Sequence, residues 1–425
     1  MAQVCVVGAG YVGLTTGTCL ASLGHSITFL DTDLERISLL QSGVMPIFEP
    51  GLQELFSEGL REHRITLTAE SAIAVKNARF IFLCVPTPQD EDGSADLSYI
   101  INAVHEIRSL LSTNSFLITK STVPVGSSHL VSDLVNRKDV TVLSNPEFLR
   151  EGSALNDFMF PDRIVVGTSN PTLVGDFLEL FESIPGERVV TDRSSAEMIK
   201  YVSNCLLAIR LSFVNDVAAF CEQIGANMTD VKKGVSLDER IGNRFLEPGP
   251  GWGGSCLPKD LPALRAAAEK VGIVMPLLTA SIESNERAHK RVVDRVEANL
   301  GGSLSGKKIG ILGLAFKANT NDTRNSPALE VAKRFISRGA AVSAYDPEVR
   351  TGIDIAIDVQ QSAIGAAYKA DALVVLTEWG EFKHLIPMDL LTSMNGKLVL
   401  DTRGILDSNL WSQAGAQFIK IGQAG

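Results

Sequence analysis

The sequence reads Val4-Cys5-Val6-Val7-Gly8-Ala9-Gly10-Tyr11-Val12-Gly13 where its first apolar run meets a glycine-rich turn. A helical pattern continues to Gly24, and a second apolar run, Ser26 to Leu30, ends at Asp31. A dinucleotide-binding unit typically has this order of elements: a strand, a G-x-G-x-x-G turn, a helix, a second strand and an acidic residue. The glycine pattern alone is weak, because it also occurs by chance, but this placement makes the prediction specific.

Each part of this unit has a physical role. Gly8, Gly10 and Gly13 permit a tight turn and a close approach of a pyrophosphate to the helix that Tyr11 and Val12 begin. The free N–H groups and the dipole of a helix N-terminus favour an anion there. The carboxylate of Asp31 is placed to accept hydrogen bonds from ribose hydroxyls and would repel a 2′-phosphate. We therefore expect NAD rather than NADP.

Later apolar runs repeat the pattern of a buried strand followed by polar residues. Phe80–Val85 ends at Pro86-Thr87-Pro88, Phe116–Thr119 leads to Thr122, and Val140–Leu143 leads to the charged segment Glu147–Glu151. Ligands of open α/β sheets bind beyond the carboxyl ends of the strands, so these residues are candidates for a site. Proline-rich turns that only stop strands, or a solvated charged turn, would explain the same residues.

The middle of the chain is helical, from about Ser194 to about Leu300. Lys200 and Asn204 are one helical turn apart, so they share a face and are candidate donors to a developing oxyanion. An exposed pair is the commoner fate of such residues.

Gly249 to Asp260 interrupts these helices with four glycines, two prolines and Cys256. Lys259 and the backbone amides of this loop are placed to favour the thiolate of Cys256, which is the nucleophilic form. A buried structural cysteine is the alternative.

Length and composition set the wider bounds. The chain has 425 residues, 45% hydrophobic and 21% charged, with a formal net charge of -10. This predicts several domains and argues against a general binder of nucleic acid or anionic membranes. The six cysteines have no paired spacing, which indicates reduced thiols in a cytoplasmic protein without a metal site. No apolar run suggests a membrane span, so we expect no membrane partner.

The predicted fold class is α/β, with two Rossmann-like doubly wound domains joined by a central α-helical domain. We expect an NAD-binding domain over 1–195, a helical domain with the cysteine loop over 196–300, which would support dimerisation, and a second α/β domain over 301–425. The last domain begins its strands at Lys308–Leu314 and lacks the full glycine signature. It would hold a second nucleotide-like ligand, or serve only for packing.

Taken together, the motifs resemble the UDP-glucose/GDP-mannose dehydrogenase family over essentially the whole chain. In the family's order they are Gly8–Gly13, Pro46–Leu52, Val85–Pro88, Lys120–Pro124, Asn145–Phe148, Gly253–Cys256, Pro258–Asp260, Gly313–Lys317 and Thr377–Trp379. The resemblance implies oxidation of a nucleotide sugar at its C6 alcohol, twice, to the uronate, with reduction of two NAD+. UDP-glucose is the implied substrate and GDP-mannose the alternative. A single-step hydroxyacid-type dehydrogenase and an inactive nucleotide-binding protein are competing hypotheses.

The resemblance also implies roles for individual residues. Cys256 would be the nucleophile, Lys200 and Asn204 would stabilise oxyanions, and Asp260, Thr122 and Glu151 would serve proton transfer and hydrolysis. Contacts to NAD would come from Asp31, Arg36, Thr87, Thr122, Glu151, Lys259 and Arg324. The UDP-sugar would be lined by Glu147, Phe148, Leu149, Arg150, Glu151, Lys200, Asn204, Phe245, Leu246, Trp252, Gly253, Lys317 and Arg403. Arg240 would reach the neighbouring subunit of a homodimer.

The chain departs from common family patterns at three places. Trp252 stands where phenylalanine or tyrosine is frequent, Asp216 follows Asn215 in place of glutamate, and Gly404 replaces the asparagine of a more usual Asp-x-Arg-Asn. These departures weaken the inference of the exact sugar and leave the catalytic set intact.

Overall fold

The computed structural model describes residues 1–90 and 92–423, which fall into two compact units. The first unit comprises Met1–Ser203 and Pro262–Ile273, and the second comprises Asn204–Leu261 and the chain from Val274 onward. Two helices, α9 (Arg193–Ile224) and α11 (Leu257–Lys270), contribute residues to both units. The predicted domain boundaries at 195 and 300 stay predictions.

The first unit is built on an eight-stranded sheet in the order β3-β2-β1-β4-β5-β6-β7-β8. Neighbouring strands are parallel except β6 and β7. The first six strands have the doubly wound order of dinucleotide-binding folds, with β1 central and β4 beside it. The strands are β1 (Gln3–Val7), β2 (Ser26–Leu30), β3 (Ile65–Thr68), β4 (Phe80–Leu83), β5 (Phe116–Thr119), β6 (Thr141–Ser144), β7 (Arg163–Gly167) and β8 (Glu187–Thr191).

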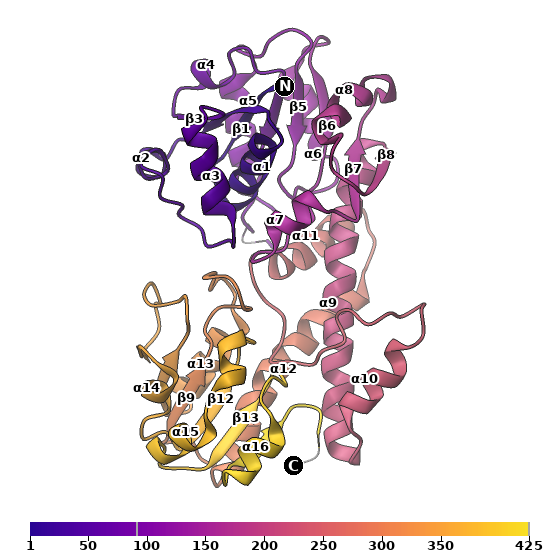
Figure 1. The fold of residues 1–425 in the computed structure, drawn as a ribbon. Coiled ribbons are helices and arrows are strands. Elements are labelled where there is room, and N and C mark those ends of the chain that lie inside the picture. The colour runs from indigo at the N-terminus through magenta and orange to yellow at the C-terminus, as the bar shows by residue number, and fades with distance from the viewer. Residues whose placement is uncertain (91, 424–425) are drawn as a thin grey trace. The chain divides into compact units, whose positions relative to one another are not determined.

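Helices cover both faces of this sheet (Figure 1). They are α1 (Tyr11–Ser22), α2 (Leu34–Gln41), α3 (Leu52–Arg61), α4 (Ser71–Ala74), α5 (Ser98–Ile107), α6 (Ser127–Val135), α7 (Ala154–Met159) and α8 (Val174–Leu178), with 3-10 turns η1 (Pro171–Leu173) and η2 (Glu179–Phe181). Successive side chains of β4 point to opposite faces of the sheet, so each face has an apolar surface for helices to cover. Phe80 and Phe82 join the apolar cluster under α1, whereas Ile81 and Leu83 join the cluster under α5 and α6.

The second unit repeats this architecture with six parallel strands in the order β11-β10-β9-β12-β13-β14. The strands are β9 (Lys308–Leu312), β10 (Ala341–Tyr345), β11 (Ile357–Val359), β12 (Ala372–Val375), β13 (Leu398–Asp401) and β14 (Gln417–Lys420). Its helices are α10 (Met228–Ser236), α12 (Pro276–Asn299), α13 (Pro327–Ser337), α14 (Ala363–Ala367), α15 (Pro387–Ser393) and α16 (Ser408–Gln413), with the 3-10 turn η3 (Gly380–His384). The predicted α/β class with two doubly wound sheets is confirmed.

The acid after the second strand has different surroundings in the two sheets. Asp31 follows β2, and Asp346 occupies the same place after β10. Asp346 is fully buried, and its Oδ2 accepts hydrogen bonds from the N–H groups of Leu314 (2.7 Å) and Ala315 (3.0 Å) and from Nε1 of Trp379 (3.0 Å). In the second sheet this carboxylate is therefore hydrogen-bonded to the turn that follows β9, at Leu314 and Ala315.

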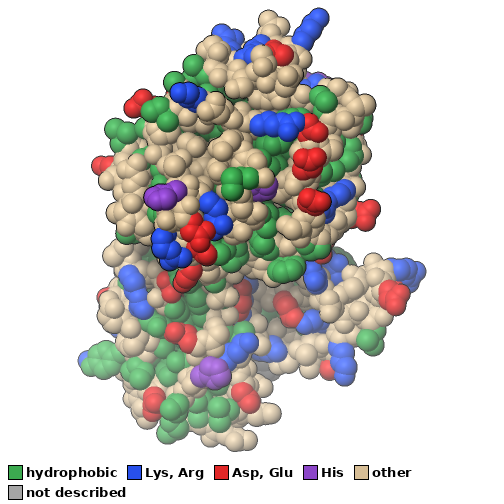
Figure 2. Space-filling view, turned by 45° about the horizontal axis from the view of Figure 1, so that its top comes forward, with side chains coloured by type: hydrophobic (Ala, Val, Ile, Leu, Met, Phe, Trp, Pro, Cys, Tyr) green, Lys and Arg blue, Asp and Glu red, His purple; other side chains and the backbone are tan. Residues whose placement is uncertain are grey.

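Helix α9 bears on one sequence-based expectation. It contains an 18-residue window of mean hydropathy 1.4, of which 44% is buried, so by length and composition it passes a test for a membrane-spanning helix. This result does not contradict the expectation of no membrane partner, which stays a prediction. The result is weak evidence, because core helices of soluble proteins pass the same test. On the face drawn in Figure 2, acidic and basic side chains are interspersed.

Candidate active site

The glycine turn of the first unit fits a dinucleotide pyrophosphate. Gly8 has φ +100°, and a Cβ there would lie 2.7 Å from the carbonyl oxygen of Cys84. A Cβ on Gly13 would lie 1.9 Å from the carbonyl oxygen of Gly8, so α1 packs closely on the turn. Gly10, the residue before α1, has nothing within 4 Å of its Cβ position and no side-chain cap. Open space beside an uncapped helix N-terminus is what a phosphate requires.

Asp31 lies beside this turn, as the sequence predicts. Its side chain is 8% exposed, and Oδ2 accepts a hydrogen bond from the N–H of Ala9 (2.7 Å). Arg36 Nη1 lies 3.1 Å from the same oxygen. The carboxylate therefore meets the start of the turn, where it faces the position of a ribose in this fold.

The strand ends are tied together by hydroxyl groups. Thr87 Oγ1 donates to the carbonyl oxygen of Thr122 (2.8 Å), and Ser121 Oγ donates to that of Val85 (2.6 Å). These bonds link the segments after β4 and β5, so the proline-rich turns have fixed positions at the carboxyl edge of the sheet.

A buried glutamate that sequence reasoning left without a role joins three loops. Glu49 is 6% exposed and accepts hydrogen bonds from the hydroxyl of Tyr11 and from the N–H of Gly152 (2.6 Å). Burial and the Glu49 carboxylate raise the pKa of Tyr11 well above its ordinary value. The first residue of α1 is thereby fixed to the segment after Glu147. The motif Pro46–Leu52 was visible in the sequence, but its partners were not.

Lys200 and Glu147 form a buried ion pair. Their atoms Nζ and Oε1 are 2.7 Å apart, and each side chain is 5% exposed. Burial alone would raise the pKa of Glu147, but the ammonium of Lys200, the N–H of Leu149 (2.6 Å) and the charge of Lys120 outweigh it and lower that pKa. The solvated-turn and surface-pair alternatives are therefore wrong for these two residues.

The neighbouring charged residues behave differently. Arg150 is 54% exposed and pairs with Asp157 at 2.5 Å. Its guanidinium is therefore engaged by a carboxylate other than Glu147, and Glu151 is half-buried. Two cations lie near the ring of Phe148: the guanidinium of Arg163 is 3.8 Å and the ammonium of Lys200 5.6 Å from its centre.

Lys120 is a second buried lysine in this region, and no sequence pattern indicated that it would be inside. It is 5% exposed, and its Nζ donates to Asn145 Oδ1 (3.0 Å). Burial lowers the pKa of Lys120 to about 8, although the Glu147 carboxylate acts in the opposite direction. A cation of this kind behind Glu147 helps to keep that carboxylate ionised.

Glu197 positions the start of α9. It is 2% exposed, and its carboxylate accepts hydrogen bonds from the N–H groups of Gly126 and Ser128, each at 2.7 Å, at the N-terminus of α6. Burial raises the pKa of Glu197 more than these hydrogen bonds lower it. The first turns of α9 are thereby docked on α6, which sets the position of Lys200 one turn later.

In the second unit, polar side chains of two helices hold the cysteine loop. Asn215 Oδ1 accepts from the N–H of Gly249 (2.8 Å), and Asn285 both accepts from the N–H of Trp252 (2.7 Å) and donates to its carbonyl oxygen (2.9 Å). The indole of Trp252 donates to Ser212 Oγ (2.9 Å) and is 6% exposed. Trp252 thus anchors the loop on α9 and α12.

Two glycines of the loop are required by close packing. A Cβ on Gly253 would lie 2.1 Å from the carbonyl oxygen of Asn325, and one on Gly254 would lie 2.7 Å from the ring of Phe316. The loop is therefore pressed against the segment that carries Lys317. A rigid loop was expected from its glycines and prolines, and these contacts explain why it is rigid.

Cys256 stands immediately before α11 and is half-buried. The N–H groups of Lys259 (3.1 Å) and Asp260 (2.9 Å) donate to its carbonyl oxygen, so it opens the first turn of a helix of 14 residues. The N-terminal end of a helix favours the thiolate form of a cysteine. The other five cysteines are buried.

Asp260 forms the polar centre next to the cysteine. It is fully buried, accepts from Asn204 Nδ2 (2.6 Å) through one carboxylate oxygen, and pairs with the ammonium of Lys259 (2.7 Å) through the other. Asn204 therefore joins Asp260, which the helical spacing alone did not reveal. The ammonium of Lys259 is directed to Asp260, so support for a thiolate comes chiefly from the helix end.

Arg403 is held by the loop after β13. Asp401 is fully buried and accepts from the N–H groups of Arg403 (2.9 Å), Gly404 (2.8 Å) and Leu406 (2.8 Å). Arg403 Nε donates to the carbonyl oxygen of Leu376 (2.8 Å), which orients the guanidinium. Such a fixed cation suits a diphosphate.

Several predicted site residues are not gathered into these clusters. Arg240 is 88% exposed and pairs with Asp238, and Arg324 is 63% exposed and pairs with Asp322. Phe245 has a positive φ of 58°, and Leu246 after it is 6% exposed in the core of the second unit.

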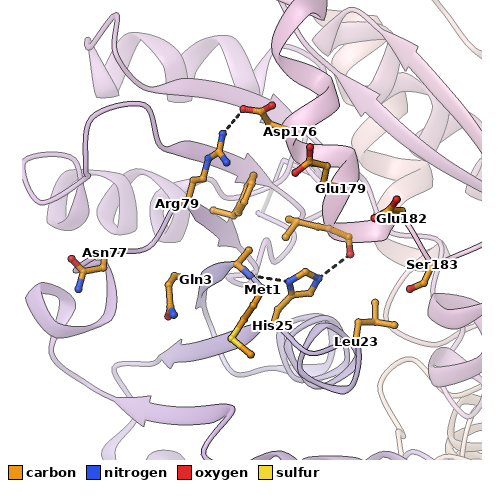
Figure 3. A pocket seen from close by; sticks show the side chains of 13 residues that line it. Met1, Gln3, Leu23, His25, Asn77, Arg79, Asp176, Glu179, Glu182 and Ser183 are labelled. Atoms are coloured by element: carbon orange, nitrogen blue, oxygen red, sulfur yellow. Dashed lines mark hydrogen bonds and ion pairs between the residues drawn. The ribbon is translucent and has the colours of Figure 1, made fainter.

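A cavity of about 790 Å³ lies at the opposite edge of the first sheet, near the amino ends of β1 and β4 (Figure 3). Both ring nitrogens of His25, which lines this cavity, have hydrogen-bond partners. The N–H of Ala2 donates to Nδ1 (3.2 Å), and Nε2 bonds the carbonyl oxygen of Leu180 (3.2 Å). Parallel sheets bind ligands at the carboxyl edge, so this cavity is remote from the chemistry. Among residues 1–90 and 92–423, no cluster of His, Cys, Asp and Glu is arranged to hold a metal ion.

Comparisons with known proteins agree with this arrangement. Residues 2–184, 194–287 and 310–408 match the NAD binding, central and UDP binding domains of one family. The chain is 40% identical over 438 residues to a UDP-glucose 6-dehydrogenase of Rhizobium meliloti, covering 99% of both chains. It is 39% identical over 431 residues to a UDP-glucose 6-dehydrogenase of Rickettsia conorii, again covering 99% of both.

A solved structure supports the same assignment. The UDP-glucose dehydrogenase of Pyrobaculum islandicum superposes with a TM-score of 0.91 and 32% identity, covering 100% of this chain and 98% of the other. The glycine turn with Asp31, which fits a dinucleotide, lies within the part that matches an NAD binding domain. The protein is an NAD-dependent dehydrogenase that belongs to the UDP-glucose/GDP-mannose dehydrogenase family.

Proposed function

We propose that the protein oxidises UDP-glucose at C6 to UDP-glucuronate, with two NAD+ consumed per sugar. The observation that carries the proposal is Cys256 at the N-terminus of α11, directly followed by the buried Asp260 with its partners Asn204 and Lys259. A single-step dehydrogenase has no use for such a nucleophile. The relatives named above act on UDP-glucose by name, which favours that sugar.

The proposed chemistry uses the cysteine to retain an aldehyde. NAD, when bound, accepts the hydride that leaves C6. A base on the protein or water removes the hydroxyl proton in the first oxidation, giving the aldehyde. The thiolate of Cys256 adds to it and forms a thiohemiacetal. This adduct would lose a hydride to a second NAD+, and a thioester would remain. Water then breaks the C–S bond, releasing the carboxylate and restoring the thiol.

The other residues act on charge and protons. Lys200, held by Glu147, and Asn204, held by Asp260, are proposed to stabilise the oxyanions of the aldehyde adduct and of thioester hydrolysis. Asp260, Thr122 and Glu151 are proposed to orient the water or carry protons. Lys317 and Arg403 are proposed to bind the diphosphate, because a fixed guanidinium and an ammonium match its charge.

The test is a stoichiometric assay. The purified protein with limiting UDP-glucose and excess NAD+ should form two NADH and one uronate per sugar. GDP-mannose and small hydroxyacids are run in parallel at the same concentrations. Turnover of GDP-mannose without turnover of UDP-glucose, or one NADH per substrate, would contradict the proposal.

We also propose a homodimer that works in the cytoplasm, where a reduced thiol such as that of Cys256 persists. In the second unit, α9 exposes Leu206, Phe213, Phe220 and Ile224, each 59% to 68% exposed and spaced by seven, seven and four residues. A continuous apolar stripe at this spacing is typical of a helix that packs on another helix. The exposed guanidinium of Arg240 is then available to a neighbouring subunit.

Phe213→Asp should convert the dimer into a monomer at micromolar concentration, because the stripe would acquire a charge at its centre. Sedimentation velocity measures this directly. Ile386→Asp, also at an exposed apolar position of the second unit (60% exposed), is the matched control and should stay dimeric. A wild-type protein that sediments as a monomer would refute the dimer.

A further inference from the structure

A cavity of about 240 Å³ lies in the second unit at the carboxyl ends of β13 and β14. Its lining includes Thr402, Arg403 and Gly404 after β13, and Lys420, the last residue of β14. Lys232 of α10 and Glu247, which precedes the cysteine loop, also line it. The carboxyl edge of a parallel sheet is where ligands of this fold bind.

The charge of this cavity is positive. Three cations, Lys232, Arg403 and Lys420, face one carboxylate, Glu247. Lys232 is ion-paired with Glu247, and Arg403 lies 3.2 Å from a carboxylate oxygen of Glu378. Lys420 differs: among residues 1–90 and 92–423, no carboxylate oxygen lies within 4.0 Å of its ammonium. The lining therefore has an excess of cation at Lys420.

Gly404 determines where this ammonium lies. It has φ +65°, and a Cβ built there would be 2.8 Å from Lys420 Cε and 3.2 Å from Lys420 Nζ. The end of the lysine side chain thus lies directly over the glycine, one residue after Arg403. Any side chain at 404 would have to displace it. Arg403 and Lys420 are thereby held on the same wall of the cavity.

We infer that Lys420 binds a phosphate group of the nucleotide substrate beside Arg403, and that Gly404 is the residue that admits it. The inference rests on the proposed function, because it takes the ligand to be a nucleoside diphosphate sugar. Arg403 supplies a planar, oriented cation, whereas Lys420 supplies a mobile point charge with three donors. Lys420 would thus add a further cation to Arg403 and Lys317, which are proposed above to bind the diphosphate. Lys420 is then a specificity residue for the phosphates, with no role in the oxidation.

Lys420→Met tests this, because methionine keeps most of the apolar stem and removes the charge. We expect UDP to bind about tenfold more weakly by calorimetry, since the loss of one hydrogen bond between charged groups weakens binding by about a factor of ten. Uridine, which has no phosphate, should bind as before, as should NAD+. The KM for UDP-glucose should rise while kcat changes little. Lys420→Arg should restore most of the affinity. Lys383→Met removes an exposed lysine of the same unit and should leave UDP binding unchanged.

Gly404→Asn tests the second half of the inference. Asparagine tolerates a left-handed backbone, so the turn should persist while the new side chain displaces Lys420. UDP should again bind several-fold more weakly in the otherwise wild-type chain. In the Lys420→Met background the same change should add little, because the displaced ammonium is already absent. Additive effects would mean that Gly404 acts independently of Lys420, and this part of the inference would be wrong.

The outcomes separate this inference from the proposed function. If wild-type protein oxidises UDP-glucose and Lys420→Met binds UDP normally, the role of Lys420 is refuted and the function stands. If wild-type protein does not oxidise UDP-glucose but binds UDP through Lys420, the function fails and the phosphate site stands. A wild-type chain that binds no UDP refutes both. Equal weakening of UDP and uridine would point to a structural effect and would also refute the phosphate contact.

Discussion

Cys256→Ala should reduce the formation of uronate by at least about 10³-fold, because the step that captures the aldehyde would lose its nucleophile. Cys256 is half-buried, lies at the start of α11 and is not a member of the buried apolar clusters that the described residues form. The free energy of unfolding should therefore change by less than about 1 kcal/mol. The measurement is the steady-state rate of NADH formation, with quantification of the uronate.

Cys256→Ser gives the sharper result. A serine hydroxyl is a much poorer nucleophile than a thiolate, so the variant should stall after the first oxidation or before release of the acid. Cys221→Ala, at a buried cysteine of the same unit, is the matched control and should keep nearly full activity. Wild-type rates for Cys256→Ala would exclude covalent capture and would favour a single-step dehydrogenase.

Lys200→Met should lower kcat by about 10²- to 10³-fold, the usual loss when one donor to an oxyanion is removed. The same change leaves the carboxylate of Glu147 buried without its cation, which costs about 3–5 kcal/mol of stability. Activity and stability must therefore be measured separately, by the rate at saturating substrates and by denaturant unfolding.

The double variant Lys200→Met with Glu147→Gln distinguishes the two effects. Removal of both charges should recover part of the lost stability, because the Glu147 carboxylate is no longer buried without the Lys200 ammonium, while kcat should stay low. Lys233→Met, at an exposed lysine of α10, is the control and should change neither quantity. If the double variant recovered activity together with stability, Lys200 would have a structural role and the oxyanion assignment would be wrong.

The fold could be predicted from local signals. The glycine turn, the fully apolar strands and the acid at Asp31 follow from rules that act over about thirty residues. The same apolar pattern in Lys308–Leu312 and Ala341–Tyr345 predicts the second sheet. Strands β3, β7, β8, β11 and β14 were not predicted. Four of them, β3, β8, β11 and β14, are only partly buried and lack a distinct pattern, whereas β7 is apolar and buried from Ile164 to Gly167 and could have been predicted.

The site was predictable in its residues but not in its pairings. Lys200 and Asn204 share a helix face, yet nothing in the spacing indicates that one pairs with Glu147 and the other with Asp260. These partners lie 53 and 56 residues away in the chain, and only tertiary packing selects them. The roles of Cys256 and Lys200 in catalysis remain predictions.

Buried charges were the residues most easily missed. Composition places glutamate and lysine outside, so Glu49, Lys120 and Glu197 gave no signal of burial. Each is satisfied by partners in other loops, namely Tyr11 for Glu49, Asn145 for Lys120 and the start of α6 for Glu197. A buried polar group has to be hydrogen-bonded, but the sequence does not say to what.

The surroundings of Asp346 bear on binding stoichiometry. Both sheets have the strand order of a dinucleotide-binding fold, so the topology alone would allow two dinucleotides per chain. The acid that would receive the second ribose already accepts hydrogen bonds from Leu314, Ala315 and Trp379. We therefore expect equilibrium dialysis to find one NAD per chain. An enzyme that uses two NAD+ in succession at a single cofactor site must retain the oxidised sugar while the first NADH is exchanged for the second NAD+. The covalent bond to Cys256 would do this.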